Sequence, residues 1–260
     1  MNHTPNSDII KGIYAFRIWG TLGWHDIKQR YRRSVLGPFW FTLSTAIMVG
    51  VLGALYSSIL NQEIANYLPF LAAGLVVWQF ISSSILEGCT VFIASSALIK
   101  QIDLPLSVHV CRVVWRNFII LLHSLPIVVL ALIIFGDMPS YEILLLPFGL
   151  ILLLFNALWI TVVLGILCTR YRDVLPIVSN FLQIAFFFTP IMWSPEILKD
   201  RGWIAEYNPL YHLIEIVRAP ILGKQIPMES WYWSIGLVLA GLALGQYLMS
   251  QYRNRVAYWL

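Results

Sequence analysis

Charge is distributed very unevenly along this 260-residue chain, and that distribution constrains its fold more than any other feature. Six runs of twenty or more residues contain no Asp, Glu, Lys or Arg; they lie at 34–62, 64–86, 117–136, 143–169, 174–195 and 230–252. About 20 apolar residues in a helix span the hydrocarbon of a bilayer, whereas a transmembrane barrel shows short alternating segments of ~10 residues. The runs therefore predict an all-α integral membrane protein, residues 1–260 forming one domain, with six transmembrane helices at 34–62, 64–86, 108–136, 142–169, 174–195 and 230–252.

Composition supports this fold class. Hydrophobic residues make up 59% of the chain and charged residues 12%, against ~45–50% and ~25% in soluble domains. A water-soluble enzyme is therefore not expected. The net charge of +4 comes from positive residues spread over several membrane-flanking segments, so we expect no nucleic-acid partner.

The positive charges also predict an orientation. With six spans both termini lie on one side, and that side holds thirteen of the seventeen Lys and Arg residues. Because positive flanking residues stay in the cytoplasm, both termini are expected there. No stretch of seven apolar residues precedes Ser34, so we expect the N-terminus to be retained rather than removed with a signal peptide.

Residues 8–33 are expected to form an amphipathic interfacial helix. Trp24, Ile27, Tyr31 and Val35 recur at helical spacing, and charged residues cover the other side. One interpretation is a lipid-anchoring lead-in to the first span. The other is a mobile gate, or a docking site for a cytoplasmic partner.

Residues 91–103 predict a short cytoplasmic helix. Val91, Ala94, Leu98 and Ile102 form a helical stripe, which the sequence Asp103-Leu104-Pro105 ends. Its apolar face needs a cover, which lipid or another protein could supply.

The long connection at 196–229 is expected to lie outside and to contain broken or re-entrant helices. A helical stripe through Leu210 and Leu213 ends at Pro220, and Pro190 interrupts the fifth span. Such irregular backbone is tolerated at membrane depth where protein covers it or where it lines a wet cavity.

Several catalytic and metal motifs are absent from the sequence. It contains no Gly-x-x-x-x-Gly-Lys-Ser/Thr phosphate loop, no Gly-x-Ser-x-Gly elbow and no His-Glu-x-x-His zinc helix. We expect no catalytic residues, metal site or cofactor in this chain, and any ATP-dependent step must come from another chain. Polar residues at membrane depth are interpreted as interhelical hydrogen-bonding groups: His123, Asn156, Asn180 and Gln183. An intramembrane enzyme of lipid or glycan metabolism, using His123, Glu206 or Glu215, is the alternative.

Four stretches carry a family resemblance that runs from about residue 20 to the end. They are Arg30-Tyr31-Arg32-Arg33-Ser34-Val35-Leu36-Gly37-Pro38-Phe39-Trp40, Tyr171-Arg172-Asp173, Phe188-Thr189-Pro190-Ile191 and Asn208-Pro209. The chain resembles the membrane-permease subunit of bacterial ATP-binding-cassette exporters that move lipid-linked O-antigen, capsule or teichoic-acid chains across the inner membrane. The resemblance implies a homodimer with a pore on its axis, bound to two copies of a separate ATPase that uses ATP and Mg. An exporter of the same architecture for drugs or lipids is a further alternative.

The resemblance also suggests roles for individual residues. Aromatic residues on the first and fifth spans are candidates to line the channel, since sugar rings stack on aromatic rings: Phe39, Trp40, Phe41, Phe181, Phe186, Phe187, Phe188 and Trp193. Three consecutive residues cannot all face one pore, so one or two of residues 186–188 are expected to do so. Helix packing and lipid contact are the competing explanation.

Three smaller groups complete the candidate site. The gate helix and lipid-phosphate entrance would comprise Trp24, His25, Arg30, Tyr31, Arg32 and Arg33. The helix at 91–103 would be pushed by the ATPase through Leu98, Ile99, Lys100 and Ile102. The external gate would comprise Tyr207, Pro209 and Tyr211. Guanidinium groups bind phosphate bidentately, but the same arginines could also fix topology and contact anionic lipid.

Overall fold

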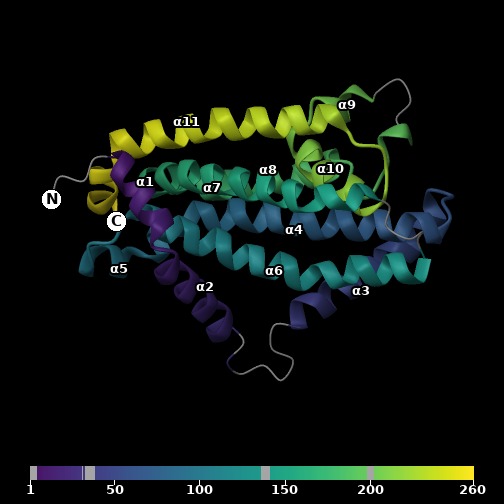
Figure 1. Cartoon of the computed structure of the whole chain (residues 1–260), viewed down its shortest axis with the longest axis horizontal. Helices are drawn as coiled ribbons and strands as arrows, with labels where there is room; N and C mark the ends of the chain where they lie inside the picture. Colours follow the sequence, from purple (N-terminus) through teal and green to yellow (C-terminus); the bar gives the residue numbers. More distant parts are fainter. Residues whose placement is uncertain (1–4, 31, 33–38, 136–140, 198–201) are drawn as a thin grey trace.

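The computed structural model describes residues 5–30, 32, 39–135, 141–197 and 202–260, and within these ranges every regular element is a helix. They are α1 (Pro5–Tyr14), α2 (Phe16–Arg30), α3 (Phe39–Ile59), α4 (Ile64–Ala94), α5 (Ser96–Gln101), α6 (Leu106–Phe135), the 3-10 helix η1 (Tyr141–Leu145), α7 (Leu146–Arg170), α8 (Val174–Phe188), α9 (Trp203–Glu206), α10 (Pro209–Ile221) and α11 (Met228–Trp259). Long helices run side by side, and both termini lie at one end of the bundle with α1 and α5 (Figure 1). We call this the terminal end. The opposite, far end carries α9, α10 and the α3–α4 connection.

Five helical segments in the described ranges are long and apolar enough to cross a membrane: Phe39–Ile59, Ile64–Gln101, Leu106–Phe135, Tyr141–Arg170 and Met228–Trp259. Each falls on one of the six uncharged runs. The chain is therefore an all-helical, multi-pass membrane protein. The run at 174–195 contains the shorter apolar helix α8.

Helix α8 has 15 residues, a length of about 22 Å at 1.5 Å per residue, against ~30 Å of hydrocarbon. It ends at Phe188 because Thr189 precedes Pro190, and a residue before proline is driven out of the helical region. Thr189 has φ −85° and ψ 133°. The segment expected over 174–195 thus consists of a helix followed by irregular backbone.

Helix α4 is the centre of the bundle. Its buried residues extend from Tyr67 to Phe92, and α3, α6, α7, α8 and α10 all pack against it. Helix α3 contributes one narrow face of small or β-branched residues at a spacing of four, Thr45, Val49, Gly53 and Ser57. Small side chains allow close approach between membrane helices. The remaining faces of α3 and α8 are exposed.

Helix α10 lies inside the far end of the bundle, where it is buried along its length against α4, α7 and α11. It begins with Asn208, whose side-chain oxygen accepts a hydrogen bond from the backbone N–H of Leu210 at 2.9 Å, and continues into Pro209 at its first position. Gly149 of α7 lets it approach closely, because a Cβ there would overlap the carbonyl oxygen of Ile216. The described part of the connection at 196–229 contains the helices α9 and α10.

Two expected segments have different bounds in the structure. The segment at 8–33 contains two helices, α1 and α2, joined at Ala15, and Tyr31 and Arg33 lie outside the described residues. In the segment at 91–103, residues 91–94 are the last turn of α4, and only Ser96–Gln101 forms the separate helix α5. Val91, the first residue of the expected stripe, is buried in a second core cluster at the terminal end, whereas Ala94 and Ile102 are exposed and Leu98 is half-buried. Protein therefore covers only the start of that stripe.

Candidate functional site

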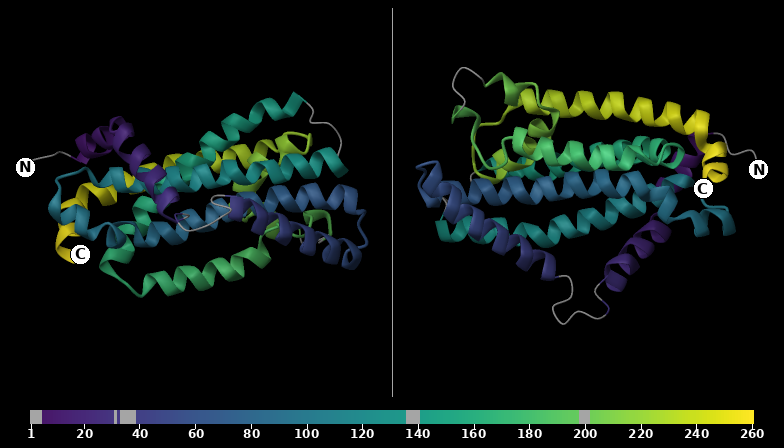
Figure 2. Two further views of the ribbon diagram at one scale, coloured as in Figure 1. Left: turned by 90° about the horizontal axis from the view of Figure 1, so that it is seen from below. Right: turned by 180° about the vertical axis from the view of Figure 1, so that it is seen from behind.

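A groove of about 570 Å³ opens between α3, α4 and α8. In the view from below, α8 runs along the edge of the bundle (Figure 2, left). The side chains that line the groove are apolar or polar without charge: Ser44, Thr45, Met48, Leu75, Trp78, Gln79, Ser82, Leu86, Ser179, Leu182, Gln183, Phe186 and Phe187. We call it the α3–α4–α8 groove.

Aromatic rings form one wall of this groove. The ring centroids of Trp78 and Phe186 are 5.6 Å apart, and those of Phe186 and Phe187 are 5.4 Å apart in an edge-to-face arrangement. Trp78 is buried and packs against Phe186, whereas Phe187 is exposed. The wall therefore combines a packed aromatic base with an accessible ring.

Amide and hydroxyl groups form the other part of the lining. Thr45 of α3 donates a hydrogen bond to Oε1 of Gln79 on α4, at 3.1 Å. Ser179 and Gln183 stand one helical turn apart on α8 and enter the same groove. These groups both donate and accept hydrogen bonds, so they suit a neutral, polyhydroxylated ligand.

The structure separates the eight aromatic residues expected to line a channel. Phe186 and Phe187 line the groove. Phe39, Trp40, Phe181 and Phe188 are exposed elsewhere on α3 and α8. Phe41 lies 5.9 Å from the Arg30 guanidinium, and Trp193 donates from Nε1 to the carbonyl oxygen of Phe187 at 3.0 Å.

An ion network holds helix α2 against α4 and α6. Asp26 of α2 accepts hydrogen bonds from Nε of Arg112 at 2.7 Å and from Nη1 of Arg116 at 2.9 Å. Glu87 of α4 in turn accepts from Nη2 of Arg116 at 2.6 Å and from Nη2 of Arg30 at 3.1 Å. The network links α2 to two helices whose contacting residues lie 57 to 90 positions away in the sequence.

Aromatic packing supports the same contact. The rings of Trp19 and Trp115 meet edge to face, with centroids 5.7 Å apart. Gly23 lies where a Cβ would come within 3.2 Å of the carbonyl oxygen of Arg112, so α2 crosses α6 closely at that point. Trp24, His25 and Arg32 of the expected gate segment are exposed.

Helix α5 presents the expected coupling residues at the terminal end. Ile102 and Lys100 are exposed, and Leu98 is half-buried. Ile99 packs against the second core cluster, which includes Met249 and Val256 of α11. Helix α5 therefore has one side packed against the protein and one side exposed, and it follows directly after α4.

At the far end, two stretches of the family resemblance meet in space. The side-chain amide of Asn208 donates to Oγ1 of Thr189 at 3.0 Å. Tyr207 and Pro209 of the expected external gate are exposed, and Tyr211 is half-buried. Burial raises the pKa of Tyr211 to about 12.

A buried arginine fixes the backbone that follows α8. Arg218 of α10 pairs with Glu215, donates from Nη1 to the carbonyl oxygen of Pro190 at 2.8 Å, and lies 4.0 Å from the ring centroid of Phe70. A cation over an aromatic face is stabilised when desolvated. Helix α10, the loop after α8 and α4 are thus joined at one point.

Two of the three groups considered for an enzyme, His123 and Glu215, make structural contacts, whereas Glu206 is exposed. Nδ1 of His123 contacts the carbonyl oxygen of Ile119 in its own helix at 2.8 Å, and Glu215 is paired with Arg218. Asn156 bridges helices as expected, donating to the carbonyl oxygen of Ser234 on α11 at 3.3 Å.

The groove contains residues that sequence reasoning missed. Thr45, Trp78, Gln79 and Ser82 were not singled out, and Gln183 was interpreted only as a helix-packing group. The available signal was the helical spacing of uncharged polar residues, Gln79 with Ser82 and Ser179 with Gln183. That pattern places them on one face but does not say which helix the face meets.

The bundle of apolar helices with an uncharged groove is a membrane domain, and the comparison with known families gives its class. Residues 18–222 match the family of ABC-2 type transporters, and the chain belongs to that family. It is 26% identical over 247 residues to an O-antigen export system permease protein RfbA of Klebsiella pneumoniae, covering 92% of this chain and 94% of that protein. It is also 26% identical over 223 residues to the protein of the same name from Myxococcus xanthus, covering 84% and 86%.

Proposed function

We propose that this chain is the permease subunit of an ATP-driven exporter that moves a lipid-linked, O-antigen-like polysaccharide across the bacterial inner membrane. The observation that carries the proposal is the α3–α4–α8 groove, whose lining is aromatic, amide and hydroxyl without charge. The names of the relatives, O-antigen export system permeases, support the same substrate class.

The groove chemistry suits a sliding glycan. Each sugar C–H face on an aromatic ring contributes on the order of 0.5–1.5 kcal/mol by analogy with aromatic pairs. Sugar hydroxyls exchange one amide or hydroxyl partner for the next as the chain advances. Conduction requires binding that is weak enough for the glycan to leave each position. A lining without charged groups therefore suits a neutral polymer, because no single position binds it strongly.

A homodimer would close the groove into a channel. Helices α3 and α8 flank it and expose apolar faces, including Ile47, Met48, Phe181 and Phe187. If the grooves of two copies faced each other, each copy would cover the exposed apolar faces of the other. The two grooves together would then surround the glycan on the dimer axis.

We infer that the terminal end faces the cytoplasm, because positive residues flank that side of the spans. Two copies of an ATPase, which bind ATP and Mg themselves, would dock there on α5, using exposed Ile102 and half-buried Leu98. Force on α5 would pass into α4, since the two helices are separated only by Ser95. Helix α2 would act as the gate at this end, with Arg30 and Arg32 near the lipid phosphate.

Matched groove variants test the export function. Phe187→Ala removes an exposed lining ring, and Phe188→Ala removes an exposed ring outside the lining. Gln183→Leu and Asn180→Leu form a second pair, since both residues are exposed and only Gln183 lines the groove. In cells that depend on this permease, surface glycan should fall and lipid-linked glycan should accumulate inside for Phe187→Ala and Gln183→Leu only.

Three results would contradict the proposal. Equal export by both members of each pair would remove the groove from the mechanism. Normal surface glycan after deletion of the gene would favour a drug or lipid exporter. Turnover of a lipid or glycan by the purified chain without nucleotide would favour an enzyme.

A further inference from the structure

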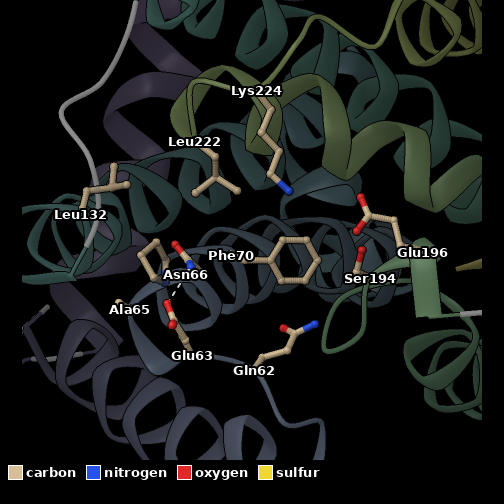
Figure 3. A pocket seen from close by; sticks show the side chains of 11 residues that line it. Gln62, Glu63, Ala65, Asn66, Phe70, Leu132, Ser194, Glu196, Leu222 and Lys224 are labelled. Carbon is tan, nitrogen blue, oxygen red and sulfur yellow. Dashed lines mark hydrogen bonds between the residues drawn. The ribbon is translucent and has the colours of Figure 1, made fainter.

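A second cavity, of about 450 Å³, is formed by residues at the far end of the bundle, none of which lines the α3–α4–α8 groove. Figure 3 shows its lining from close by. Its lining comes from the α3–α4 connection, the first turns of α4, the end of α6, the loop after α8 and the turn after α10. The volume falls within the ~300–1,000 Å³ of small-molecule sites. We call it the far-end cavity.

Phe70 of α4 forms the floor of the cavity. Figure 3 shows the ends of Lys224, Glu196 and Gln62 arranged around its ring. Nζ of Lys224 is 5.4 Å from the ring centroid, and the guanidinium of Arg218 packs on the ring at 4.0 Å. The ring is therefore held rigidly beneath an accessible cation.

The wall beside the floor is also anchored. The hydroxyl of Tyr67 donates to the carbonyl oxygen of Met192 at 2.7 Å, and Arg218 donates to that of Pro190 at 2.8 Å. These buried bonds fix the loop that carries Ser194 and Glu196 into the cavity. A site on anchored backbone loses less entropy on binding than one on a free loop.

The polar groups of the cavity form a mixed array. Glu63 and Glu196 offer acceptors, Lys224 offers donors, and Gln62, Asn66 and Ser194 offer both. Among the residues that the structure describes, no salt bridge joins Lys224 to either carboxylate. Nδ2 of Asn66 donates to Oε2 of Glu63 at 3.4 Å, so that carboxylate already has one partner (Figure 3). Lys224, Glu196 and the remaining acceptor positions of Glu63 are available to the same ligand.

This array selects a neutral ligand with several hydroxyls. The ammonium group of Lys224 opposes a metal cation, and the carboxylates of Glu63 and Glu196 oppose an anion. A hexose can bind Lys224, Glu63 and Glu196 together, because each hydroxyl both donates and accepts, while its C–H groups can rest on Leu222.

We propose that the far-end cavity is a sugar-binding subsite for one or two hexose units of the exported glycan, on the outer side of the membrane. The inference rests on the proposed function for the identity of the ligand and for the orientation of the chain. Such a subsite would hold the emerging polymer and oppose its return into the channel.

Saturation-transfer-difference NMR on the full-length permease in nanodiscs tests this subsite. The probe is the oligosaccharide mixture released by mild acid from the surface polysaccharide of the source organism. Wild type should transfer saturation to the sugar ring protons. Lys224→Met and Glu196→Gln, both at exposed positions, should each weaken binding at least about tenfold, the loss expected from one charge-assisted hydrogen bond.

Two exposed residues outside the lining provide matched controls, Gln225→Ala beside Lys224 and Glu229→Gln for the carboxylate. Both should bind as wild type does. No transfer in wild type, or equal transfer in wild type, Lys224→Met and Glu196→Gln, would overturn the subsite. Calcium binding that Glu196→Gln abolishes, without any sugar signal, would overturn it as well.

The export assay separates this inference from the proposed function. If Phe187→Ala traps glycan inside the cell while Lys224→Met binds sugar normally, only the subsite is wrong. If Phe187→Ala leaves surface glycan unchanged, the proposed function fails, whatever the NMR shows.

Discussion

Removing the carboxylate of Asp26 should release helix α2 from the bundle. Asp26 receives hydrogen bonds from both Arg112 and Arg116, and its side chain is only 12% exposed. An exposed ion pair contributes at most about 1 kcal/mol, whereas removing one partner of a buried pair costs about 3–5 kcal/mol. Asp26→Asn leaves two part-buried guanidinium groups without a full partner. We expect it to weaken the docking of α2 on the bundle by about 2–3 kcal/mol, which shifts the equilibrium between docked and released α2 roughly 30- to 150-fold.

The second carboxylate of the network provides the comparison. Arg30 contacts Glu87 at 3.1 Å, but its side chain is 43% exposed, so solvent screens the pair. Arg30→Gln should therefore cost about 1 kcal/mol or less, which is at most about fivefold. Asp26→Asn combined with Arg112→Gln should recover part of the loss, because one unpaired charge is removed.

Hydrogen–deuterium exchange of the permease in nanodiscs measures these differences. Peptides from α2 should exchange about 30-fold faster or more in Asp26→Asn and nearly as in wild type in Arg30→Gln. Peptides from α7 should be unchanged in both, since that helix contributes nothing to the network. Equal acceleration of α2 in the two variants, or none in Asp26→Asn, would refute the idea that burial decides the strength of the contact.

Three further outcomes follow from buried or exposed groups. Asp8 is buried and accepts from Arg253 and Ser107, so Asp8→Asn should lower the thermal unfolding temperature in detergent by an amount equivalent to about 3–5 kcal/mol, whereas exposed Asp103→Asn should leave it unchanged. Burial lowers the pKa of His212 below its ordinary 6.5, although nearby carboxylates raise it. As the pH falls, the unfolded state therefore takes up the proton before the folded state does, so the free energy of unfolding should decrease below about pH 6.5. His212→Gln should flatten that part of the pH profile. Leu98→Asp with Ile102→Asp should abolish ATP-driven export while the permease stays inserted, and unchanged export would remove α5 from the docking surface.

Local sequence patterns predicted the helices well because a membrane span depends mainly on length and apolar composition. Five of the six uncharged runs correspond to long apolar helices. The run at 174–195 shows the limit of the pattern. Thr189-Pro190 ends α8 early, and the residues after it are held by Arg218 rather than by helical hydrogen bonds.

The candidate site was only partly predictable. Phe186 and Phe187, two of the eight aromatic residues expected to line a channel, line the α3–α4–α8 groove. The expected bridge between helices at Asn156 is confirmed. Gln79 joined the groove only because α3 packs beside it and brings Thr45 within 3.1 Å. Helical periodicity assigns a residue to a face, but the neighbour of that face depends on how the helices pack.

The sequence alone determined that the chain is an all-helical membrane protein and that it carries no phosphate loop, because segregated charge and missing motifs are local properties. Tertiary structure alone decided which residues meet. Asp26 is 86 residues from Arg112, and Phe70 is 148 from Arg218; such contacts arise only when separate helices are packed, since pairing energy depends on distance in space and not along the chain.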